Sequence, residues 1–301
     1  MKAEFLRKIS YNPILIRVVR ACGLRGIGRK LYYRLASPQK GVLRVKCAGS
    51  SACFFTGSPE HLRAIEAVSM EPSLAAMMRA VGPGDVVYDI GSQFGVYSIF
   101  LAACVGEKGC VIAFEPQRES FEQLQQNIAL NHRTNIRPYN QALGERSSQG
   151  KLYIGTIVGN SSLLPDAIAG AGETNSVPFQ TVSVVEGDVL VKNDNLPIPT
   201  AVKIDVEGSE YAVIKGLQET LADSRCSLVC IEVHPQFLPP GISADDITTM
   251  LKSLGFTRFD ARPRRDPYAL LAFRELQQAS TGTPGGTVQS LEEARRNKNR
   301  R

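Results

Sequence analysis

The stretch VVYDIGSQFGVYS, residues 86–98, constrains the fold of this chain more than any other segment. It joins an apolar run of β-branched and aromatic residues, a turn with two glycines, and a second apolar run. The first run is typical of a strand that is buried on both faces of a sheet. Gly91 and Gly95 have no Cβ atom, so the backbone can turn sharply there and a ligand can approach it closely. The pattern predicts a strand, a ligand-binding loop and a helix, with Asp89 at the end of the strand.

A second apolar strand, CVIAFEP at residues 110–116, carries Glu115 to its carboxyl end. In open parallel sheets, ligands bind outside the carboxyl ends of the strands, and an acidic residue there can bind the ribose of an adenosine. We therefore expect Glu115 to be a ribose ligand. The glycine pattern DxGxxxG departs from the GxGxxG fingerprint of nicotinamide dinucleotide sites. A dehydrogenase is therefore the weaker interpretation of this segment.

Strands and helices alternate through the centre of the chain, which predicts an α/β fold with a mostly parallel sheet. The expected strands cover residues 85–90, 110–115, 136–142, 200–205 and 227–233. The expected helices between the first of them cover residues 95–105 and 117–131. Two last strands, 255–263 and 268–275, predict a terminal antiparallel hairpin.

Three regions are expected along the chain. Residues 1–80 form an N-terminal extension of helices with two short strands within 42–56. Residues 81–276 form the main domain, in which the connection 144–199 is long enough to carry strands of its own. Residues 277–301 are rich in Ser, Thr, Gly, Gln and Arg and are expected to be a disordered basic tail.

The composition indicates the compartment and the class of partner that we expect for this protein. The seven cysteines show no paired spacing, which argues against a disulfide framework and favours a reducing compartment, the cytoplasm. The formal charge is +6, but the basic residues gather at the two ends, so a nucleic-acid substrate is not favoured. The first residues are too charged and too interrupted for a membrane span or a secretory signal. They predict a helix that covers the domain, with contact to a membrane surface as the alternative.

Five motifs occur in order along the chain: DIGSQFG, FEP, QALG at 141–144, VKIDVEGSEYAVIKGL at 202–217 and IEVHP at 231–235. Together they resemble the FkbM family of S-adenosylmethionine-dependent methyltransferases, over roughly residues 80–260. The resemblance implies a class I methyltransferase fold with a Rossmann-like, seven-stranded sheet, and O-methylation of small natural products or sugars. One departure is Gln93 after Ser92, where the family usually has an asparagine.

With this resemblance, the donor S-adenosylmethionine is expected at the carboxyl ends of the first strands. The residues expected near its methionine moiety are Asp89, Gly91, Ser92 and Gly95. The residues expected near its adenosine are Glu115 on the ribose and Gln141 with Ala142 beside the adenine.

Methyl transfer also requires an aligned acceptor oxygen whose proton is removed. Asp205 ends the fourth strand, and Glu232 and His234 end the fifth, so these side chains should converge beside the donor methyl group. His234 is a candidate base, with a structural role as the alternative. Asp205 and Glu232 are instead expected to hold Mg²⁺ if a cation polarises the acceptor. Lys203 emerges on the face of Asp205 and could neutralise it or contact substrate.

Glu207 and Gly208 are expected to begin the next helix, with Glu210 one turn in, and each of these two acids either stabilises the helix terminus or joins the site. The leading hypothesis is an O-methyltransferase that acts on a hydroxyl of a small molecule, sugar or glycolipid. The alternatives are a catalytically silent binding module with a methyltransferase fold, and a nicotinamide-dependent dehydrogenase. The lid-like insertion and the N-terminal helices are expected to shape the acceptor pocket.

Overall fold

The computed structural model describes residues 41–155, 160–169, 177–262 and 268–275. The helix expected at the N-terminus and the basic tail expected at 277–301 lie outside these residues. Within them, none of the helices is both long and apolar enough to cross a lipid bilayer.

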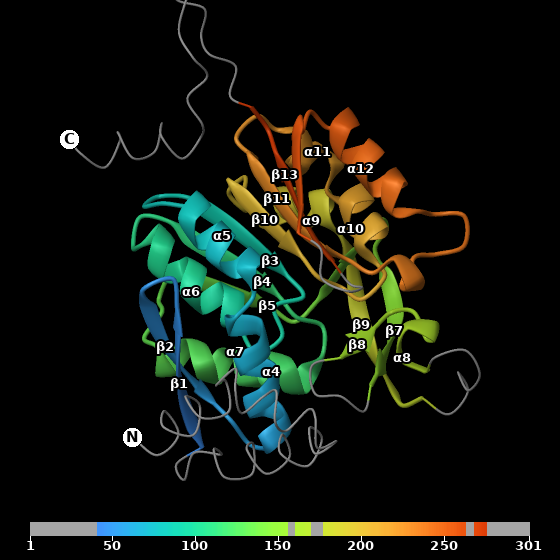
Figure 1. Cartoon of the computed structure of the whole chain (residues 1–301). Helices are drawn as coiled ribbons and strands as arrows, with labels where there is room; N and C mark the ends of the chain where they lie inside the picture. The colour runs from blue at the N-terminus through green and yellow to red at the C-terminus, as the bar shows by residue number, and fades with distance from the viewer. Residues whose placement is uncertain (1–40, 156–159, 170–176, 263–267, 276–301) are drawn as a thin grey trace, which may run out of the picture.

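A twisted, mostly parallel sheet of seven strands forms the centre of the protein (Figure 1), with the order β12-β13-β11-β10-β3-β4-β5. Strand β13 runs antiparallel to both of its neighbours, and the other pairs are parallel. The bounds are β3 Val86–Ile90, β4 Cys110–Phe114, β5 Ile136–Tyr139, β10 Ala201–Ile204, β11 Leu228–Val233, β12 Arg258–Arg262 and β13 Tyr268–Phe273. The predicted class I methyltransferase sheet with its terminal antiparallel hairpin is confirmed.

Both faces of this sheet are buried. Successive residues of a strand point to opposite faces, so each strand contributes side chains to two cores. In β3, Val87 packs into one hydrophobic core and Tyr88 into the other. The first core lies under α4 Pro59–Ser69, α5 Pro72–Ala80, α6 Val96–Val105 and α7 Arg118–Leu130. The second lies under α9 Gly187–Asn193, α10 Glu210–Gly216, α11 Gln218–Ala222 and α12 Ala244–Ser253. Double burial explains why the strands read as continuous apolar runs.

A short antiparallel hairpin, β1 Val42–Cys47 with β2 Ser50–Phe55, packs against the α7 side of the first core. The side chains of Asn127 and Asn131 on α7 accept hydrogen bonds from the backbone of Phe55 and Cys53. The two short strands expected within 42–56 are therefore present. Two polar side chains of α7 attach them to the main domain.

The long connection after β5 forms a second sheet with the order β6-β9-β7-β8. Its strands are β6 Ala142–Gly144, β7 Ser148–Ile154, β8 Ser161–Ser162 and β9 Phe179–Glu186, with α8 Asp166–Ala169 beside β8. Figure 1 shows this insertion sheet next to the end of the main sheet at which β10 and β11 finish. It lies beside the loops that carry the candidate site residues.

The sequence predicts one strand over residues 136–142, whereas the structure has two strands in different sheets. Pairing with β4 ends at Tyr139, whose carbonyl oxygen accepts a hydrogen bond from the amide of Glu115. The side chain of Asn140 then donates to the carbonyl oxygens of Glu115 and Pro116. This asparagine takes the place of further strand pairing, so the chain leaves the main sheet and enters the insertion sheet as β6.

Candidate active site

The glycine loop after β3 is fixed tightly against the chain that follows β10. Gly91 has φ +77°, and a Cβ atom at this position would lie 1.8 Å from the carbonyl oxygen of Asp205. Gly95, with φ +82°, begins helix α6. The amides of Gly91 and Ser92 both donate to the carbonyl oxygen of Phe114, the last residue of β4. Glycine is therefore needed at position 91 both for its backbone angle and for the close approach.

Glu115 is held directly beside this loop. The backbone amides of Gln93 and Gln117 donate to its two carboxylate oxygens, each at 2.8 Å. The side chain is almost fully buried, and this burial raises its pKa to about 7 although the two amide hydrogen bonds lower it. Glu115 stands at the carboxyl end of β4, where the sequence places the ribose ligand.

Gln141 and Ala142 lie at the start of β6 and line a cavity together with Gly91, Gln93 and Glu115. The Oε1 atom of Gln141 is buried, and no described residue donates a hydrogen bond to it. An unsatisfied buried acceptor is costly in a folded protein. Its position on the cavity wall suits a ligand group that donates a hydrogen bond, such as an amino group.

The cavity has a volume of about 530 Å³ including its open mouth. The main sheet contributes Ile90, Phe114 and the residues after β10, Asp205 to Glu207. The insertion sheet and the loop after β8 contribute further lining residues, among them Leu152, Ser161, Ser162 and Leu163. The cavity is therefore built by both sheets.

Asp89, Ser92 and Gly95 are not among the residues that line this cavity. The Asp89 carboxylate is fully buried beneath the loop, where it accepts a hydrogen bond of 2.5 Å from the hydroxyl of Ser98 on α6. Its other oxygen lies 3.5 Å from Nζ of Lys203. The structure thus places Asp89 behind the glycine loop, as a support for it.

The buried side chain of Lys203 contacts both the glycine loop and the Asp89 carboxylate. Its Nζ atom donates to the carbonyl oxygen of Gly91 at 2.6 Å and lies 3.5 Å from a carboxylate oxygen of Asp205 and from one of Asp89. Burial by itself lowers the pKa of Lys203, but Asp205 and Asp89 raise it more, so the pKa lies above its ordinary value. Of the two roles weighed for Lys203, this geometry favours neutralising Asp205 over contacting substrate.

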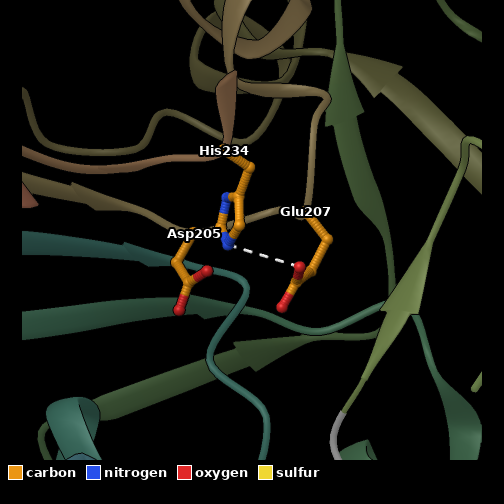
Figure 2. A group of neighbouring side chains, drawn as sticks. All are labelled: Asp205, Glu207 and His234. Carbon is orange, nitrogen blue, oxygen red and sulfur yellow. Dashed lines mark ion pairs between the residues drawn. The ribbon is translucent and has the colours of Figure 1, made fainter. Parts of the chain in front are cut away.

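Asp205, Glu207 and His234 come together on the β10 and β11 side of the cavity (Figure 2). One oxygen or nitrogen atom from each lies within 4.8 Å of the others. His234 Nε2 is 3.3 Å from a carboxylate oxygen of Glu207. Asp205 and Glu207 come from the loop after β10, and His234 follows β11, so the parallel strands deliver all three side chains to one edge.

Glu207 is directed into this group by its backbone. It has φ +50°, a left-handed conformation that is uncommon for a residue with a side chain. Its carbonyl oxygen accepts a hydrogen bond of 2.6 Å from the hydroxyl of Ser162 in β8. Burial and the charge of Asp205 raise the pKa of the Glu207 carboxyl to about 7. The insertion sheet therefore contacts the loop that carries two of the three clustered side chains.

His234 is oriented from behind by Glu210, the first residue of α10. The Nδ1–H of the ring donates to a carboxylate oxygen of Glu210 at 2.7 Å, and Glu210 is fully buried. Burial lowers the pKa of His234, but the hydrogen bond with Glu210 and the charges of Asp205 and Glu207 raise it more, to about 9. The ring therefore turns Nε2 toward Asp205 and Glu207.

Glu232 lies two residues before His234 but is not a member of the clustered three. Burial, followed by the charges of Asp205 and Glu71, raises its pKa to about 8. The sequence predicts a carboxylate pair of Asp205 with Glu232, whereas the cluster joins Asp205 to Glu207 and His234.

Comparisons with known proteins agree with this architecture. The sequence model described as "Methyltransferase FkbM domain" matches residues 89–257. "Hexuronic acid methyltransferase AglP" of Haloferax volcanii is 27% identical over 232 residues, which cover 76% of this chain and 87% of that protein. "Methyltransferase sdnD" of Sordaria araneosa is 27% identical over 62% of this chain and 80% of its own. Among solved structures, a SAM dependent methyltransferase from Aquifex aeolicus covers 70% of this chain and 96% of its own, with 16% identity and a TM-score of 0.36.

Proposed function

This chain belongs to the FkbM methyltransferase domain family, and from that membership we propose that it transfers a methyl group from S-adenosylmethionine to a hydroxyl of a sugar or a similar hydroxyl-rich acceptor. The observation that carries the proposal is the shared cavity. Glu115, Asp205 and Glu207 all line it. A donor site and a proton-accepting group therefore face the same space.

The residues on the donor side fit S-adenosylmethionine. The Glu115 carboxylate is positioned to accept hydrogen bonds from ribose hydroxyls. The unpartnered Oε1 atom of Gln141 can accept from the amino group of an adenine. Gly91 lines the cavity, so the backbone of the glycine loop can contact a ligand directly. When bound, this donor supplies an electrophilic methyl group carried by a sulfonium.

The residues on the acceptor side would orient a hydroxyl and receive its proton. Carboxylate oxygens of Asp205 and Glu207 accept hydrogen bonds from hydroxyl groups. Ser161 also lines the cavity and adds a hydroxyl group to its wall. Orientation of the reacting atoms is the largest expected contribution, about 7 to 11 kcal/mol of the barrier. Removal of the hydroxyl proton by a positioned group adds about 10²- to 10⁴-fold.

A sugar-like acceptor is supported by the wall chemistry and by one relative. The cavity offers carboxylates and hydroxyls at its acceptor end, which suit a molecule with several hydroxyl groups. The name of the Haloferax relative describes a hexuronic acid methyltransferase. Glycolipids share the same sugar chemistry and belong to the same proposal.

The six described cysteines are all free, which supports a reducing, cytoplasmic location.

Isothermal calorimetry with S-adenosylmethionine, S-adenosylhomocysteine and NAD⁺ tests the donor half of the proposal. We expect micromolar affinity for the first two ligands and no heat with NAD⁺. An acceptor screen with neutral sugars, uronic acids and glycolipids then tests the second half, with mass spectrometry to detect a gain of one methyl group. Donor binding without methylation of any acceptor would favour a silent binding module, and binding of NAD⁺ alone would overturn the proposal.

A further inference from the structure

We propose that Asp205, Glu207 and His234 form a binding site for a divalent transition-metal ion at the acceptor end of the cavity. The three side chains offer two oxygen ligands and one nitrogen ligand from two separate segments of the chain (Figure 2). The proposal concerns the site of the proposed function. It can be tested without a donor or an acceptor.

The spacing of the three ligand atoms is close to what one ion requires. Ligands bind such ions at about 2.0 to 2.2 Å, so two ligand atoms on opposite sides of one ion lie up to about 4.4 Å apart. The candidate atoms lie within 4.8 Å of one another. The side chains of Asp205 and Glu207 are 18% and 22% exposed, so they have room for the small rotations that close this gap.

Glu210 supplies an independent observation, because it lies outside the three ligands and faces the far side of the imidazole. Metal-binding histidines usually donate their other ring N–H to a carboxylate or carbonyl group, which fixes the ring and its tautomer. His234 does this through Nδ1, at 2.7 Å from the fully buried Glu210. The backbone amide of Gly208 donates to the same Glu210 oxygen. The ring is thus held with Nε2 toward Asp205 and Glu207.

The balance of charge also favours a cation. Asp205, Glu207 and Glu210 place three carboxyl groups around one imidazole ring. Lys203 is the neighbouring cation, and it is shared between Asp205 and Asp89. The second carboxylate oxygen of Glu210 is buried and accepts no hydrogen bond from the described residues. A divalent ion that replaces the Nε2 proton of His234 would be attracted by these carboxyl groups.

The donor set selects among metals. Mg²⁺ prefers an all-oxygen, octahedral site, whereas imidazole nitrogen suits ions such as Zn²⁺, Fe²⁺ and Ni²⁺, and the two carboxylates also suit Mn²⁺. The site therefore differs from the magnesium pair that the sequence predicts at Asp205 and Glu232, both in its ligands and in its metal. An ion here would make a bound hydroxyl more acidic, and His234 would then act as a ligand rather than as the base.

Mn²⁺ is the probe of choice, because thiolates are poor ligands for it and the described cysteines are free. We would strip the full-length protein of metal and titrate it with Mn²⁺ by calorimetry and electron paramagnetic resonance. We expect one tight site and much weaker binding of Mg²⁺. Asp205→Asn, Glu207→Gln and His234→Gln should each weaken Mn²⁺ binding by about tenfold or more, and Glu210→Gln by about 10- to 100-fold. Glu232→Gln is the matched control and should retain the site.

The chain has only three histidines, which gives a second test on the unaltered protein. In ¹⁵N spectra of histidine-labelled protein, Zn²⁺ should shift the Nε2 resonance of His234, with His61 and His132 as internal controls. Absence of tight Mn²⁺ binding together with an unshifted His234 would overturn the proposal. The proposal would also be overturned if Mn²⁺ bound with unchanged affinity to folded variants that carry each of the three ligand substitutions. Mn²⁺ binding in a protein that does not bind S-adenosylmethionine would leave this inference standing and overturn the proposed function.

Discussion

Lys203 Nζ donates a hydrogen bond of 2.6 Å to the carbonyl oxygen of Gly91. This contact ties the glycine loop after β3 to β10, the strand that leads into Asp205. One buried cation therefore links the donor side of the cavity to the acceptor side.

Replacement of Lys203 by methionine should destabilise the protein and weaken donor binding. The change leaves Asp89 buried without a counter-charge, and breaking a buried ion pair in this way costs about 3 to 5 kcal/mol. Urea unfolding and calorimetry with S-adenosylmethionine measure the two effects. Lys192→Met is the control, because its ion pair with Glu219 is exposed to solvent and contributes little to stability. Equal effects of the two substitutions would contradict the linking role of Lys203.

Glu115→Gln should weaken the binding of S-adenosylmethionine by about ten- to a hundredfold, because a charge-assisted hydrogen bond is worth about 1.5 to 3 kcal/mol. Calorimetry of the variant and the parent protein gives the difference directly. Glu122→Gln, an exposed position on helix α7, provides the control and should bind like the parent. Parent-like affinity of Glu115→Gln would remove Glu115 from the donor site.

Donor affinity should also depend on pH through Glu115. Its pKa in the ligand-free protein is raised to about 7, so the carboxyl is mostly protonated below that pH and charged above it. The charged form is the better acceptor for ribose hydroxyls, so affinity should rise as the pH increases from about 6 to about 8. The Glu115→Gln variant should lack this component of the pH dependence. An identical pH profile in both proteins would argue that Glu115 does not titrate on donor binding.

Gly91→Ala should abolish donor binding and destabilise the fold. The new Cβ would meet the carbonyl oxygen of Asp205, so the backbone of the loop or of the segment after β10 must move. Gly84→Ala is the control for the backbone angle alone. Gly84 also has a positive φ, +87°, but a Cβ atom at this position would have no other atom within 4 Å. The control should cost about 1 to 2 kcal/mol. Thermal unfolding and donor titration should therefore show a distinctly larger loss for Gly91→Ala.

Ser162→Ala should change acceptor use more than donor binding. The Ser162 hydroxyl is buried, donates to the carbonyl oxygen of Glu207 and accepts from the amide of Leu164. Its loss removes hydrogen bonds worth about 1 kcal/mol each and loosens the insertion sheet from the loop after β10. We expect a higher KM for the acceptor and an unchanged Kd for S-adenosylmethionine. The exposed Ser148→Ala in β7 should change neither value.

The sequence was sufficient to locate the carboxyl ends of β3, β4, β10 and β11, because buried parallel strands appear as apolar runs with a polar residue at the end. It therefore indicated that Glu115, Asp205 and His234 lie along one edge of the sheet. It did not indicate that Asp89 turns away from the cavity. That direction depends on Ser98 and Lys203, which reach Asp89 only through tertiary packing.

The partners of His234 were also beyond sequence reasoning. Glu207 reaches the imidazole because its backbone adopts φ +50°, a conformation that no glycine or asparagine signals at this position. Glu210 faces Nδ1 because α10 begins at this residue. Likewise, the split of the strand expected over 136–142 depends on the side-chain hydrogen bonds of Asn140 to residues of a different loop.

The part of the insertion that runs from β7 to the loop after β8 lines the cavity but carries none of the residues assigned to the donor. Substitutions around Leu152 and Ser161 to Leu163 alter the cavity surface without changing the hydrogen bonds that hold Glu115. Homologous proteins can therefore acquire new acceptors through substitutions in this inserted segment while the hydrogen bonds of Glu115 are kept. Acceptor preference among relatives should accordingly follow the sequence of the insertion more closely than that of the main sheet.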